Sequence, residues 1–504
     1  MMSHGTADLC AVLKLSPLLR CFYGMRRCFA AWAVCFLVGA VFAQEDFPSL
    51  EPTFVFDAAE RTLSGEDVIR VGLEFSLCPQ DSPQGARVLA AYRELEAAVC
   101  ADSFLSLAEA DRAESILTLM YERVLTQYVA DQTNIATMFA AGTYNCVSSS
   151  VLYFALAKAA GLAVAGQETP DHAFCTVTVD GKRIDVETTN PGGFNPGVRK
   201  VVEQTADTTR YFVVPKKYYA NRREVGERKF VSLVGRNLVA MMNEKNDYAR
   251  GVPLSAARLA FTQQAGEADA KAVRADFDTV AGNYAVVLDQ HRSQSERALE
   301  WLDAVYARWS ASAALQNIYD TVVYNCAANY LNVGDVAQAQ RAFAAHKAAM
   351  SEKNATAVDT MIFARYIEDS ARSLPADDAI AFLRAQRNAP AAKDRAVAAR
   401  LDELEAHSWY QKLKPLFDQG DYLAAAAFAD EGLKSVPGNR NLKTIRSQCY
   451  QNYAIDVHNA YAALANAGRY DEALAVVQDG LAVVPANAML KNDLKRLQSF
   501  LQKR

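Results

Sequence analysis

A cysteine and a histidine with the order and spacing of a nucleophile and its base lie in the N-terminal half of the chain. Cys146 opens an apolar stretch of helical spacing, and His172 follows 26 residues later as the first residue of an extended stretch. The positive end of a helix dipole and the first backbone N–H groups favour a thiolate and stabilise an oxyanion. His172 is then placed to accept the proton of that thiol. The pattern predicts nucleophilic acyl transfer.

The third member of such a site is a carboxylate that fixes the imidazole tautomer. Two short runs rich in β-branched residues, 173–179 and 182–187, are separated by Asp180-Gly181, a strong hairpin signal. Asp185 and Glu187 lie two residues apart in the second run, so they face the same side of the predicted strand. Either residue fits the role.

The elements before this hairpin are predicted to be helices. Ser64 to Asp67 resembles a helix cap, and helical spacing resumes over 88–99. A third helical stripe runs from Ile116 to Tyr128, and the helix that starts at Cys146 should end at Gly161. The turn-rich segment 189–197 reads as a loop beside the site.

The other cysteines suggest no cofactor. Cys175 lies three residues after His172, on the opposite face of a strand, which argues against a shared metal site. The paired C-x-x-C spacing of a structural zinc site is missing from the sequence. Cys78 with Cys100 is the one disulfide that the helix-loop-helix context favours.

The last hundred residues contain two copies of one unit. A Gly at 420 and again at 468 is followed after 17 residues by a Pro, at 437 and at 485. A turn at Gly, small packing residues and a terminating Pro are typical of tetratricopeptide-like repeats, and a weaker copy starts near Gly334. The copies stand 48 residues apart rather than about 34, so the array is irregular or contains a lengthened helix.

The first residues are typical of a Sec-type signal peptide. Met25-Arg26-Arg27 precedes an apolar run at 28–42, and Val41-Phe42-Ala43 fits a cleavage site before Gln44. Met25 is itself a candidate start, and an uncleaved anchor is the alternative. Cleavage would release a periplasmic or secreted protein with no stable membrane span.

Composition limits the partners. The 504 residues are 51% apolar and 22% charged, enough for at least two domains. A net charge of -5 argues against nucleic acid and anionic lipid, which favours a protein or peptide partner. We expect a signal peptide at 1–43, an α+β domain at 44–229, irregular helical repeats at 230–400 and tetratricopeptide-like repeats at 401–504.

Three segments together resemble a known family. Asn145-Cys146-Val147-Ser148, Pro170-Asp171-His172-Ala173-Phe174 and Ile184 to Thr189 are similar to the motifs of the transglutaminase-like, papain-like Cys-His-Asp superfamily, in its bacterial branch with tetratricopeptide repeats. The resemblance implies Cys146 as nucleophile, His172 as general base, and Asp185 or Glu187 as the acid. Phe174 replaces the usual Trp.

Two functions follow from these expectations. As an enzyme, the protein would form a thioester at Cys146 and resolve it by peptide or amide hydrolysis, deamidation or crosslinking. As a non-catalytic scaffold, it would bind partner proteins through the helical repeats, since a fold alone does not establish chemistry.

Overall fold

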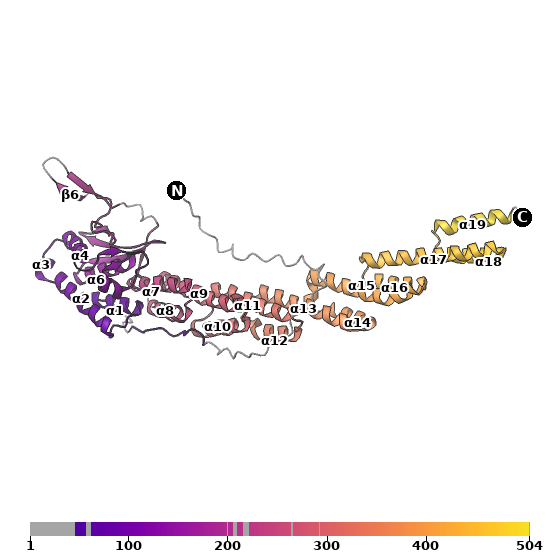
Figure 1. Ribbon diagram of the computed structural model, residues 1–504, viewed down its shortest axis with the longest axis horizontal. Helices are drawn as coiled ribbons and strands as arrows, with labels where there is room; N and C mark the ends of the chain where they lie inside the picture. The colour runs from indigo at the N-terminus through magenta and orange to yellow at the C-terminus, as the bar shows by residue number, and fades with distance from the viewer. Residues whose placement is uncertain are drawn as a thin grey trace, which may run out of the picture. The chain divides into compact units, whose positions relative to one another are not determined.

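The computed structural model describes residues 46–56, 62–198, 200–204, 209–214, 221–263, 266–291 and 293–502. The predicted signal peptide at 1–43 lies outside these residues. Pro48–Arg504 forms one compact unit. It is mostly helical and contains a small sheet region (Figure 1).

The sheet-bearing part precedes the helical part in the chain (Figure 1). Its helices are α1 (Gly65–Phe75), α2 (Pro83–Val99), α3 (Asp102–Leu105), α4 (Glu109–Arg123), α5 (Ile135–Ala141) and α6 (Cys146–Ala159). Its strands are β1 (Gln127–Tyr128), β2 (Thr143–Tyr144), β3 (Ala163–Glu168), β4 (Ala173–Val179), β5 (Lys182–Val186), β6 (Lys200–Gln204), β7 (Thr209–Phe212) and β8 (Arg223–Val225).

The central sheet has the order β5-β4-β3-β8, with every neighbouring pair antiparallel. The predicted hairpin is confirmed as β4 and β5, joined at Asp180 and Gly181, whose φ angles of 49° and 73° suit a tight turn. Helix α6 packs on β3 and β4. The helix that begins at Cys146 therefore lies directly against the strand that His172 precedes.

The predicted capped helix is confirmed, whereas the predicted third helix is shorter than expected. Ser64 and Asp67 form a capping box at the start of α1. Helix α4 ends at Arg123, and Tyr128 lies in β1, which pairs in parallel with β2. The amide of Thr126 donates to Gly142 O at 2.8 Å, so pairing with the segment just before α6 replaces helix propagation.

The disulfide expected between Cys78 and Cys100 is wrong, because both are free thiols. The Cys78 sulfur lies 3.7 Å from Ser82 Oγ, four residues further along the chain. The Cys100 thiol donates to Ala159 O at 3.4 Å, at the end of α6. Each thiol therefore has a local polar partner of its own.

The helical part follows β8. Its helices are α7 (Glu227–Glu244), α8 (Tyr248–Thr262), α9 (Glu267–Val286), α10 (Ser295–Trp309), α11 (Ala313–Asn332), α12 (Val336–His346), α13 (Glu352–Ser373), α14 (Ala376–Gln386), α15 (Arg395–Asp418), α16 (Tyr422–Ser435), α17 (Arg440–Asn466), α18 (Tyr470–Val483) and α19 (Ala488–Leu501). Short turns of π-helix at Val287–His291 and of 3-10 helix at Lys347–Ala349 and Pro390–Lys393 interrupt them.

Packing in the helical part follows a regular scheme. From α7 onward each helix contacts the next, and each odd-numbered helix also contacts the next odd-numbered one. The repeat units seen in the sequence correspond to α16 and α18, which begin just after Gly420 and Gly468. Helix α17 between them is 27 residues long, which explains the wide spacing of the two copies.

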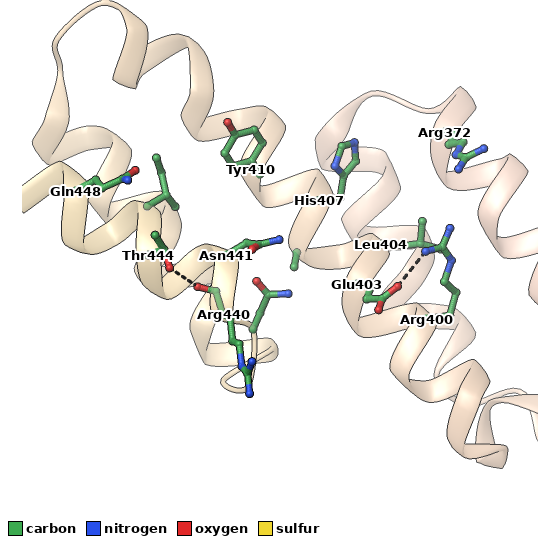
Figure 2. Close-up of a pocket in the computed structure, with 13 residues that line it drawn as sticks. Arg372, Arg400, Glu403, Leu404, His407, Tyr410, Arg440, Asn441, Thr444 and Gln448 are labelled. Carbon is green, nitrogen blue, oxygen red and sulfur yellow. Dashed lines mark hydrogen bonds and ion pairs between the residues drawn. The ribbon is translucent and has the colours of Figure 1, made fainter. Parts of the chain in front are cut away.

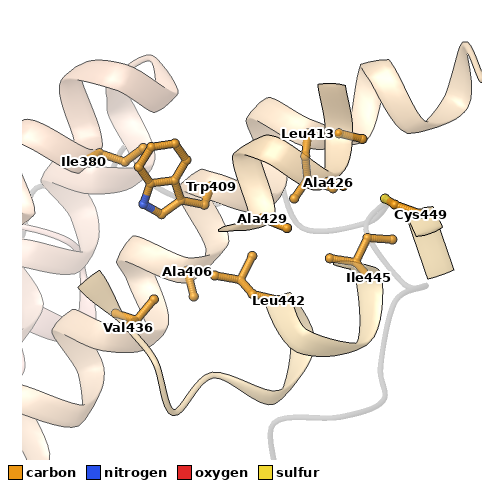
Figure 3. Packing of buried hydrophobic residues seen from close by; sticks show 11 residues of the cluster. Ile380, Ala406, Trp409, Leu413, Ala426, Ala429, Val436, Leu442, Ile445 and Cys449 are labelled. Atoms are coloured by element: carbon orange, nitrogen blue, oxygen red, sulfur yellow. The ribbon is translucent and has the colours of Figure 1, made fainter. Parts of the chain in front are cut away.

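One apolar cluster holds α14 to α17 together (Figure 3). Trp409 is 8% exposed and packs with Ile380 and Leu442 from neighbouring helices. Truncating a buried Trp to Ala costs about 3–5 kcal/mol, so this residue is central to the stack. Among the helices that the structure describes, none is long and apolar enough to cross a bilayer.

Candidate active site

Cys146 is the first residue of α6 and is half-buried. The side-chain oxygen of Asn145 caps the helix by accepting from the amides of Val147 at 3.0 Å and Ser148 at 3.1 Å. Ser148 Oγ in turn accepts from the Asn145 amide at 3.0 Å, which completes a capping box. Since the cap engages two of the first amides, an oxyanion contact from this helix start falls to the amide of Cys146.

His172 is held by a turn that leads into β4. The Thr169 amide donates to His172 O at 2.8 Å, and the Thr169 hydroxyl donates to Asp171 Oδ1 at 3.2 Å. The His172 ring stacks on Phe174 with centroids 6.2 Å apart. Its side chain is 18% exposed, so the imidazole is shielded but reachable.

Glu187 is the carboxylate beside the imidazole. Its Oε2 lies 2.7 Å from His172 Nε2. Its Oε1 accepts from the Thr189 hydroxyl at 2.6 Å and from the Thr189 amide at 3.0 Å. Because Nε2 is taken by Glu187, the ring nitrogen left for the hydrogen bond to Cys146 is Nδ1.

His172 and Glu187 each stabilise the charged form of the other. Burial alone would lower the pKa of His172, but hydrogen bonds to Cys146 and Glu187 outweigh it and raise that pKa to about 10. Burial would raise the pKa of Glu187, yet its bonds to His172 and Thr189 hold that pKa below its ordinary value. At neutral pH the site therefore holds an imidazolium against a carboxylate.

Asp185, the other candidate for the acid, has different partners. In the sheet it lies opposite Thr176, and the Thr176 hydroxyl donates to Asp185 Oδ1 at 3.0 Å. Arg222 Nη1 donates to Asp185 Oδ2 at 2.5 Å. The structure thus brings Cys146, His172 and Glu187 together and directs Asp185 to Arg222.

The loop at 189–197 packs back onto Glu187. The Glu187 amide donates to Gly193 O at 2.9 Å, and Val186 forms a β-bridge with Phe194. A Cβ at Gly193 would lie 1.8 Å from Glu187 O, so only glycine fits this approach. The loop therefore fixes the backbone that carries Glu187.

A buried hydroxyl cluster, which the sequence analysis did not identify, joins the acid segment to α6. Thr188 Oγ1 lies 2.8 Å from Ser149 Oγ and 2.7 Å from Ser150 Oγ. The Tyr121 hydroxyl donates to Thr188 O at 3.0 Å and lies 3.0 Å from the Tyr144 hydroxyl. The signal was a run of three serines, 148–150, in an otherwise apolar helix.

Cys175 takes no part in this arrangement. It is fully buried, and its thiol donates to Ser150 O at 3.4 Å. Burial raises the pKa of Cys175 well above its ordinary value, which keeps the thiol protonated. Over the described ranges, no cluster of three His, Cys, Asp or Glu side chains is arranged to hold a metal ion.

Comparison of the chain with protein-family models, with curated proteins and with solved structures finds no match. The resemblance to the transglutaminase-like superfamily stays a prediction from the sequence segments around Cys146, His172 and Glu187. Function has to come from the geometry of these residues and of the elements that position them.

Proposed function

We propose that Cys146, His172 and Glu187 are a catalytic triad for acyl transfer on a protein or peptide substrate, within a transglutaminase-like domain. The observation that carries this proposal is the 2.7 Å contact between His172 Nε2 and Glu187 Oε2, which leaves Nδ1 for Cys146. The raised pKa of His172 supports an imidazolium beside Cys146 at neutral pH.

In this reaction the Cys146 thiolate attacks an amide carbonyl and forms the C–S bond of a tetrahedral intermediate. His172 then gives its proton to the leaving amine, the C–N bond breaks, and a thioester remains. Water or a second amine attacks the thioester while His172 takes its proton, and the C–S bond breaks. Water gives hydrolysis or deamidation, and an amine gives crosslinking.

We also propose that the protein is exported, and that the helical part forms a tetratricopeptide-like solenoid which binds a protein or peptide partner. The continuous contacts between odd-numbered helices from α7 to α19 support this role. The alternative function is a scaffold without catalysis, which the same helical part would serve.

The test is the rate at which iodoacetamide modifies Cys146 across pH, read by mass spectrometry of the modified peptide. The samples are residues 44–504 as wild type, Cys146→Ala and His172→Ala. An activated thiol reacts well below the pKa of an ordinary thiol, about 8.5, and loses that advantage without its histidine.

Cys100 is the internal control, because the residue as a whole is exposed. Burial of its sulfur atom and the nearby Glu96 raise the pKa of its thiol. Its labelling should follow the profile of an ordinary or weakened thiol in every variant. Equal pH profiles for Cys146 and Cys100 in the wild type would remove the enzyme proposal and leave the scaffold.

A further inference from the structure

A groove of about 820 Å³ lies among α13, α15 and α17 (Figure 2). The side chains that line it share one face of α15 and one face of α17, namely Arg400, Glu403, His407 and Tyr410 on α15, and Asn441, Thr444 and Gln448 on α17. Leu404, Ala406 and Ile445 are buried and form an apolar floor. Its volume is within the range of ligand-binding clefts in proteins, about 300–1,000 Å³.

Packing of the helices does not account for the polar walls. The faces of the same two helices next to the groove are already buried, with Leu413 of α15 and Leu442 and Cys449 of α17 in the cluster around Trp409 (Figure 3). The exposed groove faces contribute little apolar area to that core. The exposed polar side chains of these faces are therefore open to contact with a ligand.

The ion pairs among the described residues of the groove leave one arginine without an acidic partner. Glu368 of α13 lies 2.5 Å from Arg372 and 2.9 Å from Arg400, and Arg400 also pairs with Glu403 at 2.9 Å. Among the described residues, Arg440 has no ion-pair partner, and it is the exposed first residue of α17. With Glu368, which lies outside the lining, counted beside Glu403, two glutamates face three arginines, and the net charge is +1 in a chain whose total is -5.

The remaining wall suits peptide groups. Asn441 and Gln448 carry amide donors and acceptors, and the Thr444 hydroxyl, which donates to Arg440 O at 2.9 Å, keeps acceptor capacity. From Arg400 to Tyr410 the α15 wall runs about 15 Å at about 1.5 Å per residue. An extended chain of four or five residues has that length.

We propose that this groove binds an extended segment of a partner protein that carries one internal Asp or Glu. The carboxylate of that residue pairs with Arg440, and the main chain of the segment lies along the side-chain amides of Asn441 and Gln448 on α17. The proposal rests on the proposed partner-binding role of the helical part and is independent of the chemistry at Cys146.

Fluorescence polarisation with the full chain tests this directly. The probes are pools of fluorescein-labelled octapeptides, blocked at both ends, whose fixed central residue is Asp/Glu, Asn/Gln or Lys. We expect the Asp/Glu pool to bind about tenfold more tightly than the Asn/Gln pool, and Arg440→Ala to abolish that preference.

Arg446→Ala is the matched control, because Arg446 is on the same helix, outside the groove, and pairs with Asp430 at 3.0 Å. It should bind all pools as the wild type does. Equal binding of the Asp/Glu and Asn/Gln pools, or an unchanged preference in Arg440→Ala, overturns the proposal.

Two further samples separate other sources of binding. Succinate that displaces the Asp/Glu pool at equal concentration would assign the groove to small carboxylic acids and overturn the peptide proposal. Cys146→Ala should bind the Asp/Glu pool unchanged. A loss of binding in that variant would place the peptide at the cysteine and overturn the groove as its site.

Discussion

Two histidine–carboxylate pairs with the same N–O distance lie in different regions of the molecule, one in the sheet-bearing part and one near the C-terminal end of the helical part. His172 Nε2 lies 2.7 Å from Glu187 Oε2, and His458 Nδ1 lies 2.7 Å from Asp493 Oδ2. Both carboxylates are buried, with side chains 7% and 4% exposed. Distance and burial of the acid therefore do not distinguish the two pairs.

Their surroundings do distinguish them. His172 is 18% exposed and hydrogen-bonds Cys146, whereas His458 is 36% exposed and has Tyr461 beside it, with ring centroids 6.2 Å apart. The second pair joins α17 to α19 and serves packing. A His–carboxylate pair can thus serve packing alone, and we propose that the thiol beside His172 gives the first pair its chemistry.

The largest expected difference between the pairs is in thiol reactivity. His172→Ala should slow iodoacetamide labelling of Cys146 at pH 6 on the order of 100-fold, because an unassisted thiol is then almost entirely protonated. His458→Ala should leave that rate unchanged. The measurement is peptide mass spectrometry of timed samples, and equal slowing by both variants would show that the two pairs do not differ in this way.

The next effect concerns the proton on His172. Glu187→Gln should lower the His172 pKa from about 10 by roughly one pH unit or more, since it removes a hydrogen-bonded negative charge. NMR titration of the imidazole carbons measures this, with Asp493→Asn as the control.

The raised His172 pKa also gives the sign of a stability effect. Because the folded state binds this proton more tightly, the stabilisation is complete below pH 6.5, the ordinary pKa, and is lost as pH rises through about 10. The advantage of wild type over Glu187→Gln in urea unfolding should therefore shrink between pH 7 and pH 10.5. A constant difference would contradict the assignment.

A smaller effect is expected at the second pair. Asp493→Ala should destabilise the docking of α19, because it removes the hydrogen bond between His458 and Asp493. The loss should be only about 1 kcal/mol, since the partly exposed His458 can bind water instead. Hydrogen exchange of the α19 amides should accelerate roughly fivefold. Exchange in α6 should not change, and a change there would couple the two regions.

The smallest effect sharpens the choice of acid. Asp185→Asn should change the labelling rate of Cys146 by less than about twofold, because Asp185 bonds Thr176 and Arg222 and not the imidazole. A loss as large as that of Glu187→Gln would reverse the assignment of the acid.

The residues and the local elements of the site could be predicted from the sequence. Cys146 begins a helix, and Asp180-Gly181 closes a hairpin, because caps and turns are fixed by a few neighbouring residues. The repeat unit likewise gave α16 and α18, whose ends depend on nearby Gly and Pro.

What local patterns could not decide was which distant groups meet. Asp185 and Glu187 were equivalent by strand alternation, but β5 ends at Val186, and Gly193 from the following loop holds Glu187 in place. The extent of α4 was misjudged for the same reason, since β1 forms only by pairing with β2. Long-range hydrogen bonds settle both positions.

The position of Cys175 bears on how the site would respond to oxidation of Cys146. If the half-buried Cys146 is the nucleophile that we propose, peroxide would convert it to a sulfenic acid, which a second thiol nearby normally rescues as a disulfide. Cys175, 29 residues further along the chain, is buried in the core, and its thiol donates to Ser150 O. Cys175 would therefore not serve as the resolving partner of an oxidised Cys146.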